Sequence, residues 1–262
     1  MSNNEGGILV SRSVPNEELP VTISSNYKTI PNVYKLPRIG AGHDGYIFQF
    51  NNQALKLLKY DITLRKEQGL MTFEKALYFK DHLHLQRITQ PTDILLNQDG
   101  VYTGYVMPYI DDLTSPKKKG TPRYRQPGDF SCGDLIESWD LLEQDFSQMT
   151  ANHVRAKDIN RGSYLFGSDF MYLCDMDKYE VTSGSPADMN QSSLNFAMAK
   201  FLAYEMEKSD AYDKSRKREI DRWVKKQSNS RGFFQDIQTE IGSDYGTPIS
   251  EFTDYKVKTL LR

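Results

Sequence analysis

Three closely spaced glycines stand directly before a segment with the pattern of a β-strand. The glycines are Gly40, Gly42 and Gly45. In residues 46–50 the aromatic side chains fall on every second position, and this period of two predicts a strand. Asn51-Asn52 predicts a tight turn because Asn tolerates positive φ, and residues 54–58 predict the returning strand. Glycines that lead into a hairpin differ from those of a dinucleotide-binding unit, where they open a helix.

Further along the chain, helical and strand periods follow one another. The expected elements are one helix between Thr63 and Leu85, a hairpin of residues 94–96 and 101–107 around Asp99-Gly100, and amphipathic helices over 134–153 and 193–208. The first part of the chain is therefore rich in strands, and the second part is mainly helical.

The bulk composition is that of an ordinary globular protein. The 262 residues can bury a sizeable core, and the charged fraction of 26% and aromatic fraction of 12% argue against a mainly disordered chain. The net charge of -2 gives no bulk attraction to nucleic acid, so no nucleic-acid partner is expected. Cys132 and Cys174 lack the close pairing of a zinc site or disulfide framework, which favours a reducing compartment.

No segment approaches the eighteen apolar residues of a membrane span. The first residues also lack the basic and apolar regions of a secretion signal. We therefore expect no membrane span and a cytoplasmic protein, while an export route that uses no such signal stays open.

Residues 34–208 carry several landmarks of the protein kinases, in the order in which kinases have them. Ile47 stands at the place of the Val in the kinase glycine loop, and Ala54-Leu55-Lys56 matches the Ala-x-Lys of the third strand. The chain resembles the small bacterial relatives of the eukaryotic-type protein kinases, as a divergent member. The resemblance implies that the glycine-loop backbone covers the ATP phosphates and that Lys56 pairs with the α- and β-phosphates. The nucleotide contacts that it implies here are Gly40, Gly42, Gly45, Ile47 and Lys56.

The resemblance also implies how the chain is divided. It predicts an α+β, protein-kinase-like fold with a β-rich N-lobe that holds one helix and a mainly helical C-lobe. By the resemblance, residues 26–111 form the N-lobe with the glycine loop and the hinge, and residues 112–262 form the C-lobe with the catalytic and metal-binding loops. The polar composition of residues 1–25 predicts a flexible N-terminal arm before the lobes. Residues 111–130, rich in Pro, Gly, Lys and Arg, predict a linker or inserted loop.

In kinases a carboxylate on the helix after the third strand orients the lysine for phosphate binding. By the resemblance this carboxylate is Glu74, and Glu67 is the alternative. The hinge that holds adenine is implied at Met107 as the gatekeeper, Pro108 for its carbonyl and Ile110 for its N–H.

Residues 157–166 and 170–177 resemble a catalytic loop, a short hairpin and a magnesium-binding aspartate. Asp158 fits the loop aspartate that accepts or orients the hydroxyl proton. Asp175, followed by Met176 and Asp177, stands where kinases have Asp-Phe-Gly. Carboxylate oxygens suit magnesium, which also keeps water and phosphate ligands.

The chain departs from the kinase pattern at three places. Ser163 stands where kinases have the Asn that binds a second metal, so Asn160 or Asp177 compensates or catalysis is reduced. Residues 156–157 are Ala-Lys instead of His-Arg, so no control through an activation-loop phosphate is expected. Only residues 176–192 separate the metal aspartate from the next helix, without an Ala-Pro-Glu, as in phosphotransferases that act on antibiotics and choline.

Two functions are compatible with these residues. The first is an ATP- and Mg2+-dependent phosphotransferase, a Ser/Thr protein kinase that acts on a protein, itself included, with a small-molecule hydroxyl acceptor as the variant. In it Lys56 and Asp158 are catalytic, and Asp175, Ser163 and Asp177 form the metal set. The second is a pseudokinase that binds nucleotide or serves as a scaffold.

Overall fold

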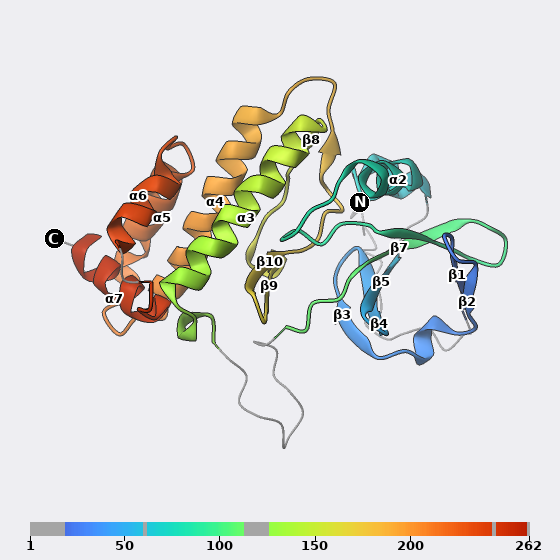
Figure 1. Cartoon of the computed structure of the whole chain (residues 1–262), viewed down its shortest axis with the longest axis horizontal. Helices are drawn as coiled ribbons and strands as arrows, with labels where there is room; N and C mark the ends of the chain where they lie inside the picture. Colours follow the sequence, from blue (N-terminus) through green and yellow to red (C-terminus); the bar gives the residue numbers. More distant parts are fainter. Residues whose placement is uncertain (1–18, 60–61, 113–125, 243–244, 261–262) are drawn as a thin grey trace, which may run out of the picture. The chain divides into compact units, whose positions relative to one another are not determined.

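The computed structural model describes residues 19–59, 62–112, 126–242 and 245–260 (Figure 1). Over these residues the protein is an α+β structure with seven α-helices. Contacts divide the chain into two compact units. The sheet unit comprises the described parts of residues 1–61 and 91–109, and the helical unit those of residues 62–90 and 110–262.

The sheet unit is built on seven strands whose neighbours all pair antiparallel, in the order β2-β1-β6-β7-β5-β4-β3. The strands are β1 (Val21–Ile23), β2 (Lys28–Ile30), β3 (Arg38–Ala41), β4 (Gly45–Phe50), β5 (Gln53–Leu58), β6 (Asp93–Leu96) and β7 (Tyr102–Pro108). Phe48, Leu55 and Val106 are fully buried in the core on this sheet. The hairpins predicted from the sequence are confirmed as β4–β5 and β6–β7, and Asn51 has the expected positive φ of 54°.

The sheet begins earlier than the sequence predicts. β1 lies inside residues 1–25, where an arm is expected, and it pairs with both β2 and β6. Val21 and Ile23 are each 1% exposed. These two apolar side chains, on alternate positions of the strand, fix β1 in the core although the neighbouring residues are polar. Residues 1–18 of the expected arm and residues 113–125 of the expected linker lie outside the described residues.

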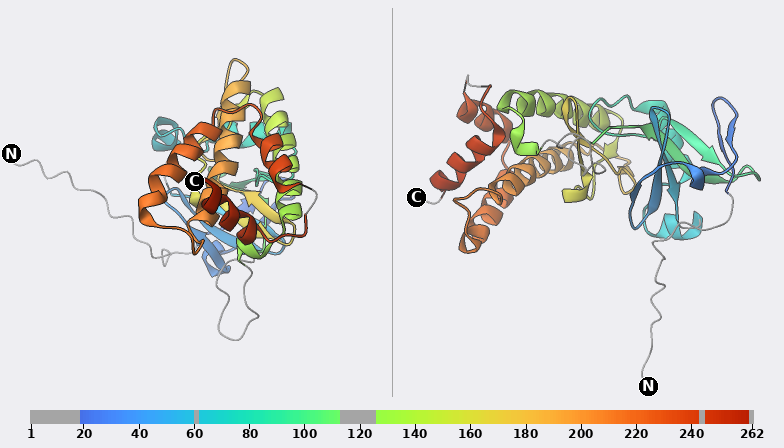
Figure 2. Two further views of the ribbon diagram at one scale, coloured as in Figure 1. Left: turned by 90° about the vertical axis from the view of Figure 1, so that its left-hand side faces the viewer. Right: turned by 90° about the horizontal axis from the view of Figure 1, so that it is seen from below.

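The helical unit contains the seven helices, four short strands and three 3₁₀ turns. Its helices are α1 (Ile62–Glu67), α2 (Phe73–His82), α3 (Cys132–Ala151), α4 (Ala187–Met206), α5 (Lys217–Gln227), α6 (Phe233–Ile241) and α7 (Ile249–Leu260). Its strands are β8 (Val154–Arg155), β9 (Tyr164–Gly167), β10 (Phe170–Leu173) and β11 (Glu180–Val181). In Figure 2, α5, α6 and α7 gather beside the α3–α4 pair.

The core of the helical unit is aromatic. Trp139 of α3 is fully buried, with its ring centroid 6.0 Å from Phe234 and 6.4 Å from Phe233 of α6. Phe201 of α4 packs against Phe170 at the start of β10, at 5.8 Å. The central helices therefore position β9 and β10 by packing.

The prediction of one helix between Thr63 and Leu85 is wrong, because the structure has two. Gly69, with a φ of +65°, and the residues around it separate α1 from α2. The Thr72 side chain then accepts the N–H of Lys75 and caps α2. By its contacts α2 belongs to the helical unit, whereas the sequence reasoning assigns it to the N-lobe.

No helix among the residues described in the structure is long and apolar enough to span a bilayer.

Candidate functional site

The predicted glycine loop is a tight turn between β3 and β4. A backbone hydrogen bond closes the turn, in which the Gly42 N–H donates to the Gly45 carbonyl oxygen at 3.0 Å. The three glycines differ in what surrounds them. A Cβ on Gly42 would meet nothing within 4 Å, whereas a Cβ on Gly45 would lie 2.5 Å from the Leu57 carbonyl oxygen. Gly45 is therefore required for strand packing, and Gly42 stands at an open turn that a ligand can approach.

Lys56 lies in the middle of β5 and is 5% exposed. Its register partners are Ile47 on β4 and Tyr105 on β7, and its ammonium lies 5.9 Å from the centroid of the Tyr105 ring. Gly45 on one side and Gly104 on the other let both neighbouring strands approach this residue. A Cβ on Gly104 would lie 2.0 Å from the Lys56 carbonyl oxygen. Gly104 is absent from the predicted site, although a glycine inside a strand pattern is a known sign of close backbone approach.

The predicted hinge residues fall at the boundary between the two units. Met107 is buried in β7 and pairs with Ala54, while Pro108 is exposed at the end of the strand. Ile110 is the first residue after this boundary and belongs to the helical unit. In the helical unit the Ile110 side chain packs close to Gly167 of β9, where an added Cβ would lie 3.0 Å from its Cγ2 atom.

The loop after β8 is held by hydrogen bonds within itself. The Asn160 side chain accepts the Gly162 N–H at 2.8 Å and donates to the Asp158 carbonyl at 3.1 Å. Ser163 is 3% exposed, and its hydroxyl accepts the Asn160 N–H at 3.1 Å. Asp158 adopts a left-handed φ of 59°. The predicted metal ligand Ser163 is thus part of the turn that shapes the loop.

This loop is bonded to the end of β10, where the second predicted aspartate follows. The Cys174 N–H donates to the Ser163 carbonyl at 2.8 Å, and Asp175 comes next with a φ of 74° and an exposed side chain. Asp177, two residues later, is 1% exposed. The structure therefore brings Asp158, Ser163 and Asp175 into one region of the helical unit.

Two lysines that the sequence pattern does not single out lie at this region. The Lys178 ammonium is 2.7 Å from a carboxylate oxygen of Asp158. The Lys75 ammonium donates to the backbone carbonyls of Gly69 at 3.0 Å and Asp177 at 2.5 Å. Burial lowers the pKa of Lys75 to about 8, although the nearby carboxylates of Asp177 and Glu180 act in the opposite direction.

Glu74, the predicted partner of Lys56, lies exposed in the first turn of α2. Hydrogen bonds from its own backbone N–H and from the Thr72 side chain lower the pKa of its carboxyl. Glu67, the alternative, is exposed at the end of α1. Both carboxylates belong to the helical unit and Lys56 to the sheet unit.

The described residues contain no group of three or more His, Cys, Asp or Glu side chains that could hold a metal ion. Magnesium in nucleotide enzymes is commonly held by one or two carboxylates and the substrate phosphates, so it does not need such a group. The exposed carboxylate of Asp175 fits this mode, whereas the hydroxyl of Ser163 is engaged in its own loop.

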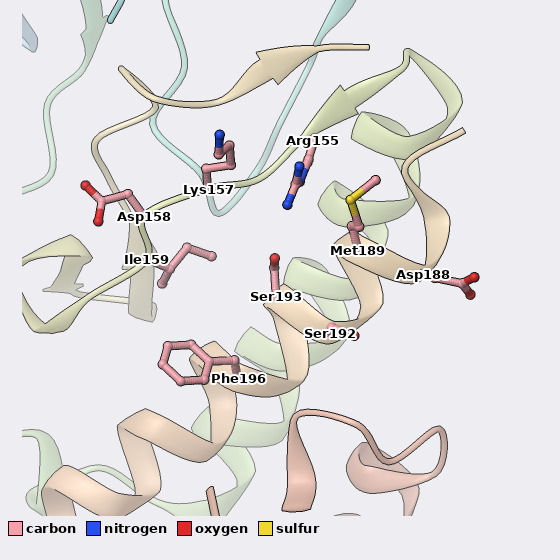
Figure 3. A pocket seen from close by; sticks show the side chains of 9 residues that line it. All are labelled: Arg155, Lys157, Asp158, Ile159, Asp188, Met189, Ser192, Ser193 and Phe196. Atoms are coloured by element: carbon pink, nitrogen blue, oxygen red, sulfur yellow. The ribbon is translucent and has the colours of Figure 1, made fainter. Parts of the chain in front are cut away.

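A cavity of about 550 Å³ opens beside Asp158 (Figure 3). It is lined by Arg155, by residues 157–159 and by the first half of α4. In Figure 3 the Ser193 hydroxyl points to the side on which Arg155 and Lys157 lie, and Asp158 stands at one edge of the cavity. This volume is in the range of small-ligand sites, which are about 300–1,000 Å³.

No protein-family model matches the chain, and no curated protein matches it closely enough to count as a relative.

Proposed function

We propose that the chain is an ATP- and magnesium-dependent phosphotransferase of the protein-kinase-like class, with the hydroxyl of a protein Ser or Thr as the acceptor. One observation carries the proposal. The loop with Asp158 is hydrogen bonded through Ser163 to the strand that leads into Asp175, with 2.8 Å between the Cys174 nitrogen and the Ser163 oxygen. An aspartate for the acceptor proton and an aspartate for magnesium are the two carboxylates that kinase-type phosphoryl transfer uses.

The sheet unit supports the proposal independently. A glycine turn between two strands and a buried lysine on the following strand correspond to the kinase arrangement around the phosphates. Lys56 lies three strand residues after the hairpin turn and is held between its register partners Ile47 and Tyr105, which is the strand position that the kinase lysine occupies. The unit boundary at Tyr109 also falls within the segment that resembles a hinge.

Each of these residues has a distinct role in the proposed reaction. Asp158 accepts or orients the proton of the acceptor hydroxyl, and Lys178 holds its carboxylate in place. Lys56 contacts the nucleotide phosphates. Asp175 holds magnesium, whose contribution is to neutralise the charge on the phosphoryl oxygens.

The test is the transfer of label from radiolabelled ATP to the protein itself or to added Ser/Thr peptides. Transfer is expected with magnesium and should be lost in Lys56→Met and in Asp175→Asn. The exposed residues Lys35 and Asp210 provide matched controls, Lys35→Met and Asp210→Asn, which should transfer as the original protein does. Equal labelling in all four variants would exclude the proposed roles.

A pseudokinase is the second candidate, and a specific observation favours it. The Ser163 hydroxyl is buried and accepts the Asn160 N–H, so the side-chain oxygen at the place of the second metal ligand is already engaged in shaping the loop. In this candidate ATP with magnesium binds but is not turned over. Ligand at 100 times its dissociation constant stabilises a fold by about 2.7 kcal/mol. A rise in Tm without any transfer identifies the pseudokinase, and no rise excludes both candidates.

A further inference from the structure

One face of α4 stays accessible along the whole helix, whereas the second half of the helix is otherwise buried. The residues Met189, Ser193, Phe196, Lys200 and Tyr204 are spaced by three or four positions, so they lie on one side of the helix. Met189 is 41% exposed, and the other four are partly exposed. We name these five residues the α4 stripe.

The stripe runs beside the loop that carries Asp158. Met189, Ser193 and Phe196 line the cavity of about 550 Å³ together with Asp158 (Figure 3). Farther along, Tyr204 lines a second cavity of about 290 Å³ together with Arg161, three residues after Asp158. Both cavities thus combine residues of α4 with the loop of residues 158–161, and the stripe reaches from one cavity to the other.

Two cations of this surface have no acidic partner among the residues that the structure describes. The guanidinium of Arg161 lies 5.3 Å from the Tyr204 ring centroid, and the ammonium of Lys200 lies 5.7 Å from the same ring and 5.9 Å from that of Phe196. These cation–π contacts hold both charges at the surface without neutralising them. At the other end of the stripe, Lys157 is already paired with Glu180 at 2.6 Å.

We propose that the α4 stripe with Arg161 docks an extended, acidic Ser- or Thr-containing segment of a partner protein, which presents its hydroxyl to Asp158. The assignment of that hydroxyl rests on the proposed phosphotransferase function. The docking surface itself rests on charge complementarity with Arg161 and Lys200.

The length of the stripe favours a peptide over a small molecule. From Met189 to Tyr204 the helix rises by about 22 Å. An extended chain of about six or seven residues covers that length. Stacked bases of a nucleic acid fit less well, because Arg161 and Lys200 already lie over the Tyr204 ring.

The test measures binding directly, so that it does not depend on turnover. Fluorescence anisotropy of the full chain is recorded with three labelled probes: a Ser peptide flanked by Glu, the same peptide with Gln for Glu, and a single-stranded oligonucleotide. The acidic peptide should bind more tightly than the Gln peptide, and the difference should shrink in high salt because the contacts are exposed.

Lys200→Glu should weaken binding of the acidic peptide by about threefold to tenfold, since it reverses one exposed charge contact. Arg161→Gln should weaken it in the same direction. Lys226→Glu is the matched control: this exposed lysine of α5 gives the same change of net charge away from the stripe, and binding should not change. The Tm of each variant checks that it is folded.

The inference is overturned if the Gln peptide binds as tightly as the acidic one, if Lys200→Glu has no effect, or if the oligonucleotide binds best. Thermal stabilisation by ATP with magnesium is measured on the same samples. Stabilisation without peptide binding overturns the docking surface and leaves the proposed function standing. Peptide binding without stabilisation supports the docking surface and overturns the phosphotransferase.

Discussion

Lys178 forms an ion pair with Asp158, with 2.7 Å between the ammonium nitrogen and the carboxylate oxygen. The side chains are 45% and 48% exposed, so the pair contributes less than about 1 kcal/mol to folding. Its consequence is local, because it joins the loop of Asp158 to the segment after Asp175 and orients the carboxylate that the proposed reaction requires.

Replacing Lys178 by Met should therefore reduce turnover more than stability. We expect kcat to fall about tenfold or more. The KM for ATP should change less than about twofold, since Lys178 acts on the acceptor side of the reaction. The Tm should fall by no more than about 2–4 °C.

Lys178→Arg should restore part of the lost rate, because the guanidinium also pairs with a carboxylate. Lys225→Met on α5 controls for the loss of a surface lysine. A purely structural role would instead lower the Tm and leave kcat of the folded fraction unchanged.

The glycine turn predicts a contrast between two substitutions in the same loop. Gly45→Ala places a Cβ 2.5 Å from the Leu57 carbonyl oxygen, so it should destabilise the sheet unit by roughly 1–3 kcal/mol. Gly42→Ala meets nothing within 4 Å and should cost less than about 0.5 kcal/mol. Urea unfolding of both variants measures the difference.

If phosphates approach the turn, Gly42→Ala should weaken ATP binding although the fold is intact. A thermal-shift titration with ATP and magnesium measures this. Equal stability of the two variants would contradict the strand packing around Gly45, and equal ATP affinity of Gly42→Ala and the original chain would contradict the phosphate role of the turn.

The β4–β5 and β6–β7 hairpins are the part of the sheet that local sequence predicts well, whereas β1 is not predicted. A period of two marks β4, and turn residues that tolerate positive φ mark the hairpin ends, Asn51 at 54° and Gly100 at 74°. The division of α1 from α2 is also a local event, but a single glycine within an apolar helical pattern is a weak signal.

The candidate site is only partly predictable, because its contacts join distant positions. The sequence patterns identify Asp158 and Asp175 through their neighbours. They do not identify Lys75, whose bond to the Asp177 carbonyl spans 102 positions, or Lys178, whose bond to Asp158 spans 20. Such pairs follow from tertiary packing between distant segments and have no period of their own.

Asp145 provides a test of how β10 is held. This carboxylate of α3 is 2% exposed and accepts the N–H of Gln86 at 2.8 Å and of Arg87 at 2.7 Å. The Arg87 carbonyl in turn accepts the Leu173 N–H at 2.7 Å, two residues before Asp175.

Asp145→Ala should destabilise the helical unit by roughly 2–4 kcal/mol, because it leaves buried N–H groups without an acceptor. Gln144→Ala, at an exposed position of the same helix, is the control and should stay within about 0.5 kcal/mol. Urea unfolding followed by tryptophan fluorescence measures both. A small effect of Asp145→Ala would show that packing alone holds residues 86–87 against β10.

Lys75 predicts a pH dependence of stability with a definite sign. Burial lowers the pKa of its ammonium from 10.5 to about 8 in the folded protein. Between these values the unfolded chain binds more protons at this lysine than the folded chain does. The free energy of unfolding therefore rises with pH across this window, and the penalty for the buried charge is complete below about pH 8.

The measurement is urea unfolding of the original chain and of Lys75→Met from pH 7 to pH 10.5. The variant also loses the hydrogen bonds to Gly69 and Asp177, which adds an offset, so the informative quantity is how the difference between the two proteins changes with pH. The original chain should gain stability relative to Lys75→Met above about pH 8. Lys66→Met, at an exposed position of α1, controls for the loss of a lysine. A difference that stays constant over the whole range would contradict a buried ammonium at Lys75.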